Sequence, residues 1–524
     1  MSFEKSKVLL GSISIIHSDW LPYAAGCLIS YCKSIPDIND RFEFLDPIYQ
    51  ALDKEKYKDL FLSVDILGLT CYVWNQAYND ELAKYYKSLR PDGIVIFGGP
   101  QVPEDAIEKL KYDQREFLDC SIEGLGEIAF SEWLLDLPRS RKVLNEMPMP
   151  YTEGVFDNLL ASGKTFKVSF ETNRGCPYSC AFCDWGGQAK SKLTRFEPDK
   201  IYSTIDYIYQ HDNINELEIL DANFGIQKQD VDVIDYMIDR QNHYDNVLKI
   251  SYSGLAKNGS KHLPIILNKI FSQIPIDQRN LKISFQTHTP EVLKTINRSN
   301  IDNNRLLPLI NEYKQKNIPT TSEMIIGLPG ETADSWLRTL HHNYHELGID
   351  YVRSYILHII NNTDMNKKEY RERHKITTKT VQYKSQEVQV LNSCYSFDGN
   401  ELVRMFRYNW FYHNLINTNV IKSQITHVYN DCIRFFEHID EMPLLKSLVD
   451  RQSDLVARFF SPDDVTLITD HNEHLWFASS LRLDDINIMI DNSEQVEQEL
   501  SIVFDRPNLL WICDNPQSSV GTIR

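Results

Sequence analysis

The stretch ETNRGCPYSCAFCDWGG, residues 171–187, places Cys176, Cys180 and Cys183 in a CxxxCxxC array. Iron–sulfur clusters are held by cysteine thiolates, and three thiolates leave one iron of a four-iron cluster without a protein ligand. Gly175 and Pro177 suit a tight turn, which lets the three sulfurs face one centre. The array therefore predicts a 4Fe–4S site whose open iron binds a substrate or a cofactor.

The three cysteines also have two plainer interpretations, as buried structural thiols or as part of a zinc knuckle. Zinc sites prefer four ligands in paired CxxC or CxxC…HxxxH spacing, and no second pair lies near this array. We therefore interpret the three cysteines as cluster ligands and as the catalytic centre.

With Phe182 before the last cysteine, the motif resembles that of the radical S-adenosylmethionine (SAM) superfamily. The resemblance implies that the amine and carboxylate of SAM chelate the open iron. One electron from the reduced cluster then cleaves SAM to a 5′-deoxyadenosyl radical. The resemblance also places Phe182 near the adenine.

Composition indicates a globular chain with more than one core. The chain has 524 residues, 42% of them hydrophobic and 24% charged, which predicts two or three domains. No apolar run reaches the ~20 residues of a membrane span. A net charge of −18 disfavours a large nucleic-acid interface. Ten cysteines without regular pairing, together with an oxygen-sensitive motif, indicate a reducing cytoplasm.

The first third alternates strand-like and helix-like stretches, the pattern of a parallel sheet covered by helices. We expect an α/β, Rossmann-like domain over residues 1–140. Its predicted strands are Val8–Ile15, Phe42–Asp46, Asp65–Thr70, Gly93–Phe97 and Cys120–Glu123, and its predicted helices are Leu21–Cys32, Ala77–Leu89 and Glu104–Tyr112.

The loops after these strands carry the informative residues, because ligands of such sheets bind at the carboxyl ends of strands. TCYVWNQAYN, FGGPQVP and EGLGE follow the third, fourth and fifth strands. Taken alone, GGP and EGxGE are also consistent with ordinary turns. Their order ahead of the cysteine array resembles the domain that binds cobalamin in cobalamin-dependent radical SAM enzymes. The resemblance implies cobalamin contacts from Thr70, Tyr72, Trp74, Gly98, Gly99, Pro100, Gln101, Glu123, Gly124, Gly126 and Glu127.

The sequence lacks the DxHxxG motif with which cobalamin mutases supply a histidine to cobalt. His17 lies in HSDWLPYAAG without that spacing, so we interpret it as a loop or surface histidine. Trp74 stands where some methylases of the family place a bulky group against the lower face of the corrin. The alternative is a half-buried aromatic at a sheet edge.

Residues 141–366 alternate strands and helices again, and six strands fit an open (β/α)6 barrel. The predicted strands are Lys167–Thr172, Glu216–Asp221, Leu248–Ser253, Lys282–Gln286, Thr321–Ile326 and Tyr351–His358. The resemblance implies that polar residues near the strand ends contact SAM. The alternative is that these residues cap the helices that follow. These residues are Asp221, Asn223, Ser251, Ser253, Gln286 and Arg298.

Residues 367–524 are rich in aromatic, helix-like stretches and predict a mostly helical domain, which in related enzymes covers the substrate pocket. Cys394, Cys432 and Cys513 are scattered, and an auxiliary cluster would require them to converge in space.

These observations favour a cobalamin-dependent radical SAM methyltransferase that methylates an unactivated carbon of a small molecule or peptide by way of methylcobalamin. Its expected cofactors are a 4Fe–4S cluster, SAM and cobalamin, and its expected partner is an electron donor such as flavodoxin or ferredoxin. The alternatives are a cobalamin-dependent cyclase or rearrangement enzyme, an enzyme that has lost cobalamin, and a sensor without turnover.

Overall fold

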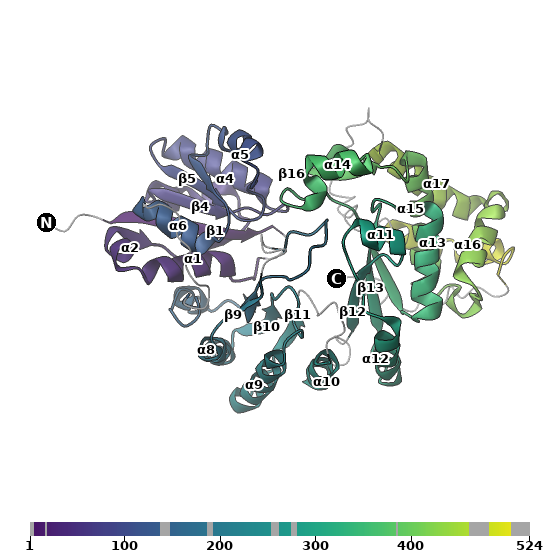
Figure 1. Cartoon of the computed structure of the whole chain (residues 1–524), viewed down its shortest axis with the longest axis horizontal. Helices are drawn as coiled ribbons and strands as arrows, with labels where there is room; N and C mark the ends of the chain where they lie inside the picture. The colour runs from purple at the N-terminus through teal and green to yellow at the C-terminus, as the bar shows by residue number, and fades with distance from the viewer. Residues whose placement is uncertain are drawn as a thin grey trace. The chain divides into compact units, whose positions relative to one another are not determined.

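The computed structural model describes residues 5–15, 18–136, 147–185, 192–252, 261–273, 280–383, 386–460 and 482–504. These residues form two compact units (Figure 1). The first contains the described residues up to 273 together with 360–364, and the second contains residues 280–359 and 365–504. The division falls within the predicted barrel, so the three domains expected from the sequence stay a prediction.

The first unit begins with a parallel sheet in the order β2-β1-β4-β5-β6, to which β3 adds by pairing with β1. After β1 the chain forms β2 and β3 on one side and then crosses to β4 on the other, which makes the β1–β4 boundary a topological switch point. The strands are β1 (Ser6–Ser14), β2 (Phe42–Phe44), β3 (Ile48–Gln50), β4 (Ile66–Thr70), β5 (Ile94–Gly98) and β6 (Cys120–Ile122). The five strands predicted here are all present, whereas β3 was not predicted.

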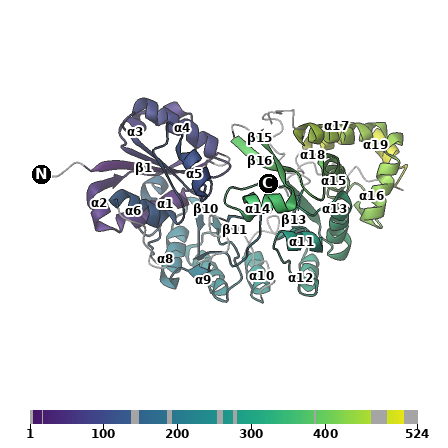
Figure 2. The same ribbon diagram turned by 45° about the horizontal axis from the view of Figure 1, so that its top comes forward.

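Helices cover both faces of this sheet, which explains why β4 and β5 are apolar throughout rather than alternating. Helices α3 (Lys58–Leu62), α4 (Gln76–Leu89) and α5 (Ala106–Asp113) supply one core, in which Phe61, Leu82 and Tyr86 are fully buried against the strands. Helices α1 (Tyr23–Lys33), α2 (Pro36–Arg41) and α6 (Gly126–Leu135) lie on the opposite face (Figure 2).

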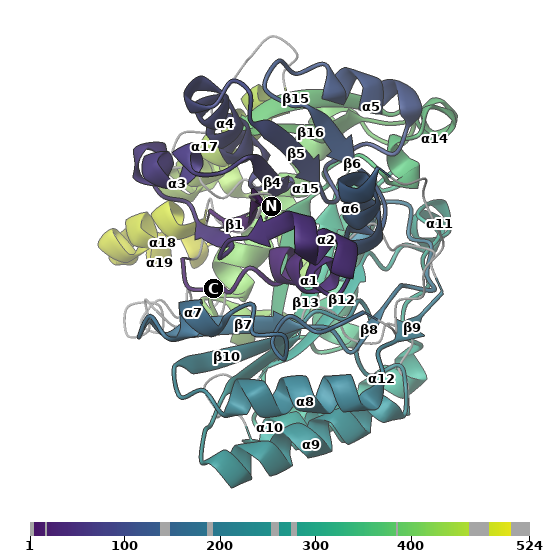
Figure 3. The same ribbon diagram turned by 90° about the vertical axis from the view of Figure 1, so that its left-hand side faces the viewer.

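A second parallel sheet in the same unit has the order β7-β10-β11. Its strands are β7 (Phe166–Phe170), β10 (Ile214–Ile219) and β11 (Lys249–Tyr252), and the short antiparallel strands β8 (Asn173–Arg174) and β9 (Thr194–Arg195) flank the cysteine loop. Helices α8 (Pro198–Tyr209) and α9 (Gln229–Tyr244) run along one side of the sheet (Figure 3). The unit also contains α7 (Asp157–Leu160) and α10 (Leu263–Gln273).

The loop after β1 is hydrogen-bonded to this second sheet. The amide of Leu21 donates to the carbonyl of Lys167 over 3.0 Å, and the amide of Lys167 donates to the carbonyl of Asp19 over 2.8 Å. Trp20 thus forms a parallel bridge with Lys167 of β7. The two sheets of the unit are therefore joined by backbone hydrogen bonds as well as by the chain.

The second unit contains the parallel sheet β12-β13-β14. Its strands are β12 (Leu281–Gln286), β13 (Thr320–Ile326) and β14 (Tyr351–Ile356), accompanied by α11 (Pro290–Thr295), α12 (Asn303–Gln315) and α13 (Ala333–His341). In the described part of the chain no strand pairing joins β11 to β12. The parallel strands are therefore confirmed, and their union in one (β/α)6 barrel stays a prediction.

The described residues from 399 onward are mainly helical, and they follow a hairpin that the sequence analysis did not predict. Strands β15 (Thr377–Tyr383) and β16 (Gln386–Ser393) pair antiparallel after α14 (Lys368–His374). The helices that follow are α15 (Gly399–Phe411), α16 (Val428–Glu437), α17 (Pro443–Phe460), α18 (Arg482–Asp491) and α19 (Ser493–Leu500). Among the described residues, no helix combines the length and the apolar character needed to cross a bilayer.

Candidate active site

The first unit has a cavity of about 670 Å³ at the carboxyl ends of β1, β4, β5 and β6, the edge where the switch point lies. Nine of the eleven residues predicted to contact cobalamin line it, namely Thr70, Tyr72, Trp74, Gly98, Gly99, Pro100, Gly124, Gly126 and Glu127. Gln101 and Glu123 are not among its lining residues. The backbone carbonyl of Gln101 instead accepts a hydrogen bond from the side-chain Nδ2 of Asn361 over 3.0 Å.

Backbone geometry explains why one position of this edge requires glycine. Gly99 has a φ of +96°, and a Cβ built there would lie 2.9 Å from the carbonyl oxygen of Cys71. Gly98 differs, because its Cβ would meet only the carbonyl oxygen of Ile122 at 3.7 Å. The second glycine of GGP is therefore the one that the turn requires.

Trp74 lies on the open side of the cavity, where 43% of it is exposed. Its ring stacks on that of Tyr72, with centroids 4.5 Å apart and planes 8° from parallel. The described residues that line the cavity include no histidine, while His17 lies outside the described residues. Among the described lining residues, only Cys27 carries a sulfur, and burial raises the pKa of its thiol well above the usual range. The described lining therefore offers a flat aromatic surface at Tyr72 and Trp74.

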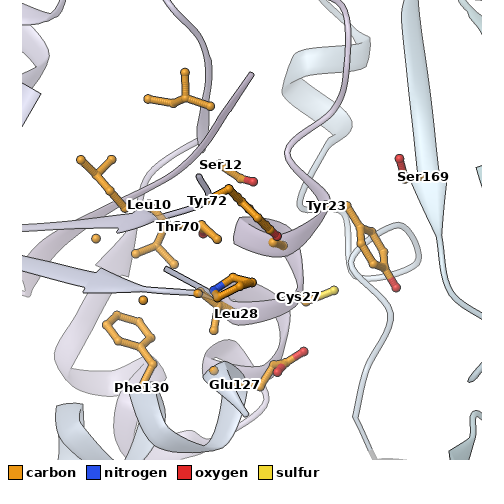
Figure 4. Close-up of a pocket in the computed structure, with 18 of the residues that line it drawn as sticks. Leu10, Ser12, Tyr23, Cys27, Leu28, Thr70, Tyr72, Glu127, Phe130 and Ser169 are labelled. Carbon is orange, nitrogen blue, oxygen red and sulfur yellow. The ribbon is translucent and has the colours of Figure 1, made fainter. Parts of the chain in front are cut away.

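The remaining wall comes from α1 and from the second sheet. Tyr23, Ser169, Glu171, Arg174 and Glu218 line it. Figure 4 shows Tyr23, Cys27, Glu127, Thr70 and Tyr72 among the residues around the cavity, with Ser169 on a separate strand. The hydroxyl of Tyr23 is buried without a hydrogen-bond partner among the described residues. Cobalamin carries amide side chains, and the polar groups of this wall suit such donors and acceptors.

Arg174 forms two short ion pairs in this wall. Its Nη1 lies 2.6 Å from Oε1 of Glu127, and its Nε lies 2.6 Å from Oε2 of Glu171. Burial raises the pKa of Glu171, and the neighbouring guanidinium opposes that shift. Glu127, predicted from EGLGE as a cobalamin contact, is thus held by an arginine of the cysteine loop.

The cysteine loop follows β7. Gly175 has a φ of +109°, which turns the backbone toward Cys176. Cys176 and Cys180 are buried, and the amide of Cys183 donates to the carbonyl of Cys180 over 3.1 Å. The three cysteines therefore lie on one compact loop, as a cluster site needs. No three His, Cys, Asp or Glu side chains in the described ranges converge as a single metal ion would require. A four-iron cluster differs, because each thiolate binds its own iron.

The residues predicted to contact SAM are not all brought together in one unit. Asn223 donates from Nδ2 to Sγ of Cys176 over 3.2 Å, and its Oδ1 has no partner among the described residues. Phe182 is half-buried within the cysteine loop. Ser251, on β11, donates to Oε1 of Glu216 over 3.4 Å. Ser253 lies outside the described residues.

Asp221 has a structural role that the sequence did not suggest. Its carboxylate accepts hydrogen bonds from the amide and the hydroxyl of Thr172 and from the side chain of Asn173, which ties the end of β10 to the end of β7. Burial raises the pKa of Asp221 to about 7. This carboxyl is therefore engaged by the chain itself, and its contact with SAM stays a prediction.

Gln286 and Arg298 belong to the second unit. Arg298 is 9% exposed, and its Nε donates to the carbonyl of Phe285 over 3.1 Å, so it closes the end of β12. Gln286 has a φ of +71° at the same strand end. In this unit Cys394 is half-buried and Cys432 is buried, while Cys513 lies outside the described residues.

Comparisons with known proteins agree with this site. Residues 170–342 match the family model of the Radical SAM superfamily. The chain is 29% identical over 389 residues to the cobalamin-dependent radical SAM methyltransferase TokK of Streptomyces tokunonensis, an alignment that covers 68% of this chain and 56% of that protein.

The chain is also 29% identical over 347 residues to the 2-(S-pantetheinyl)-carbapenam-3-carboxylate methyltransferase of Streptantibioticus cattleyicolor, which covers 60% of this chain and 50% of that protein. The matches thus span about half the length of these curated relatives. The solved structure of the cobalamin-dependent S-adenosylmethionine radical enzyme OxsB, with aqua-cobalamin and S-adenosylmethionine bound, matches with a TM-score of 0.57 at 14% identity over 95% of this chain and 80% of that one. At that identity the likeness concerns the fold alone. The resemblance to the radical SAM superfamily is confirmed.

Proposed function

We propose that this chain, whose residues 170–342 carry a radical SAM domain, is a cobalamin-dependent methyltransferase that acts on an unactivated carbon of a small molecule or peptide. One observation carries the proposal: a single compact unit holds both the three-cysteine loop and the cavity at the switch point. The similarity to two methyltransferases supports the same conclusion.

Two separate sets of residues would bind the two cofactors. Cys176, Cys180 and Cys183 would hold the cluster that generates a radical from SAM, and the cavity edge at Thr70, Gly99 and Gly124 would hold cobalamin, which carries methyl groups. Trp74 and Tyr72 would present a flat surface that keeps water from the cobalt. The remaining chain orients the reactants and excludes solvent.

Three further features stay parts of this proposal. The sheets β7-β10-β11 and β12-β13-β14 would be the halves of one (β/α)6 barrel, and Gln286 and Arg298 would then complete the SAM site. The 1–140, 141–366 and 367–524 segments would be the three domains. An external one-electron donor such as flavodoxin or ferredoxin would reduce the cluster.

The test is anaerobic reconstitution with iron, sulfide and hydroxocobalamin, followed by incubation with methyl-labelled SAM and a reductant. We expect four irons and one corrin per chain after gel filtration, and formation of both 5′-deoxyadenosine and S-adenosylhomocysteine. The triple variant Cys176→Ala, Cys180→Ala, Cys183→Ala is the matched control, which should lose the iron.

Two outcomes would contradict the proposal in different ways. If no corrin is retained at micromolar concentration, cobalamin is not a cofactor of this chain. If 5′-deoxyadenosine forms without S-adenosylhomocysteine, the chemistry is a cyclisation or rearrangement without methyl transfer.

A further inference from the structure

Arg174 is held between two carboxylates in the wall of the cavity. Its guanidinium pairs with Glu127, the second residue of α6, and with Glu171, which follows β7. The side chain of Arg174 is 9% exposed and that of Glu127 is 7% exposed, so the pair is shielded from bulk water. Buried pairs of this geometry, with each donor matched to an acceptor, are fixed in orientation.

The same arginine begins the cysteine loop. Its backbone pairs with Thr194 in the β8–β9 ladder, and Gly175 and Cys176 follow it directly. The guanidinium carbon also lies 5.5 Å from the centre of the Phe196 ring. Arg174 therefore contacts the cavity through its side chain and the cysteine loop through its backbone.

We propose that Arg174 is a positioning residue that couples the two cofactor sites, so that corrin binding in the cavity and cluster binding on the cysteine loop strengthen one another. This inference rests on the proposed function for the identity of the two ligands. Its basis is the chain of contacts from Glu127 through Arg174 to Cys176.

The physical argument is one of shared ordering. Glu127, Glu171 and Arg174 line the cavity, so a ligand there excludes the water that can still reach them from that side. The ion pairs become stronger in the drier surroundings, and Arg174 is held more firmly. An ordered Arg174 then lowers the entropy that the loop must lose when its cysteines take fixed positions around a cluster. Coupling between binding sites is reciprocal and typically amounts to about 5-fold to 150-fold in affinity.

The experiment measures the dissociation constant of hydroxocobalamin by absorbance titration, with cluster-loaded protein and with protein whose iron has been removed. The ratio of the two constants is the coupling factor. We expect a factor of about 5 or more in the wild type, and a factor below about 2 in Arg174→Lys and Glu127→Gln. Lysine keeps the charge but lacks the planar fork that engages both carboxylates, and glutamine keeps the shape of Glu127 but loses its charge.

Arg195→Lys is the matched control. Arg195 lies on β9, pairs with the buried Asp230 over 3.1 Å and does not line the cavity. We expect this variant to keep the wild-type factor. Iron release to a chelator, with and without hydroxocobalamin, measures the coupling from the other side, and circular dichroism checks that each variant is folded.

The outcomes separate the two proposals. Equal corrin affinities for loaded and iron-free wild type, or an unchanged factor in both Arg174→Lys and Glu127→Gln, would overturn the coupling while leaving the proposed function intact. A wild type that binds no hydroxocobalamin in either form would overturn both.

Discussion

The side-chain amide of Asn223 donates a hydrogen bond to the sulfur of Cys176, with Nδ2 and Sγ 3.2 Å apart. Both residues are buried, so water does not compete for this contact. Hydrogen bonds to ligating sulfurs are one of the factors that set the reduction potential of an iron–sulfur cluster. Under the proposed function, Asn223 would act on the cluster through this contact, in addition to its predicted contact with SAM.

Replacing Asn223 by leucine should lower the midpoint potential of the cluster, because a hydrogen bond to sulfur stabilises the more negative, reduced state. An electron paramagnetic resonance titration under controlled potential measures the change. Loss of one such bond should also cost about 1 kcal/mol of stability. Asn246→Leu is the control, since that amide donates to the carbonyl of Tyr209 and not to a cysteine. A potential that is the same in wild type and Asn223→Leu would contradict the assignment.

The Gly99→Ala variant should bind hydroxocobalamin more weakly than the wild type and lose about 1–3 kcal/mol of stability. The reason is that a side chain at a φ of +96° strains the backbone and that its Cβ meets the carbonyl of Cys71. Gly98→Ala is the matched control and should stay close to the wild type, because its Cβ has room. Corrin titration and thermal melting measure the two effects, and equal losses in both variants would argue against this account of the turn.

Trp74→Ala should change the coordination of cobalt as well as the corrin affinity. By the role proposed for Trp74, loss of its ring would let water reach the lower face of the corrin, and the reduced cobalt should then shift from a four-coordinate to a five-coordinate spectrum. We expect a roughly tenfold weaker affinity, equivalent to about 1.4 kcal/mol. Tyr72→Phe is the control, because it preserves the stacked ring on which Trp74 lies. Identical cobalt spectra for wild type and Trp74→Ala would show that this tryptophan does not face the metal.

His288 should make the second unit less stable in acid. Burial, and next the neighbouring His342 at a ring distance of 4.3 Å, lower the pKa of His288 to about 3. An unfolded histidine titrates near pH 6.5. As the pH falls below that value, the unfolded state binds a proton that the folded state does not bind, and this favours unfolding. The stabilising effect of the neutral ring is present above about pH 6.5 and decreases at lower pH, by up to about 1.4 kcal/mol per pH unit.

The melting temperatures of wild type and His288→Leu at pH 7, 6 and 5 test this expectation. As the pH falls, the melting temperature of the wild type should decrease more than that of His288→Leu. His243→Leu, at an exposed position of α9, is the control. A difference that does not vary with pH would mean that His288 takes no part in the acid response.

The positions of the parallel strands along the chain were predictable because each strand is a short apolar run between turn signals. The predicted strand Asp65–Thr70, for example, begins one residue before β4, which spans Ile66–Thr70. The hairpin β15–β16 was missed because the aromatic helices that follow it dominated the interpretation of the last third. Its segment TTKTVQY is rich in β-branched residues, which is the signal that favours a strand.

The site was predictable where a motif carries the chemistry, and less so where distant residues meet. The cysteine spacing and GGP are local patterns, so sequence alone located both. The contacts of Asp221 with Thr172 and of Arg174 with Glu127 join residues that are 49 and 47 positions apart. The roles of these side chains depend on which backbone or side chain the fold brings near, and no local pattern in the sequence indicates that.

The bridge between Trp20 and Lys167 has a consequence for any attempt to divide the protein. A fragment that starts at residue 147 would leave the edge of β7 without the partner that Asp19 and Leu21 now provide. Exposed strand edges recruit other chains and promote aggregation. We therefore expect the part of the chain that carries the cysteine loop to lose solubility without the residues after β1, so that expression of the two sheets as separate pieces yields insoluble material.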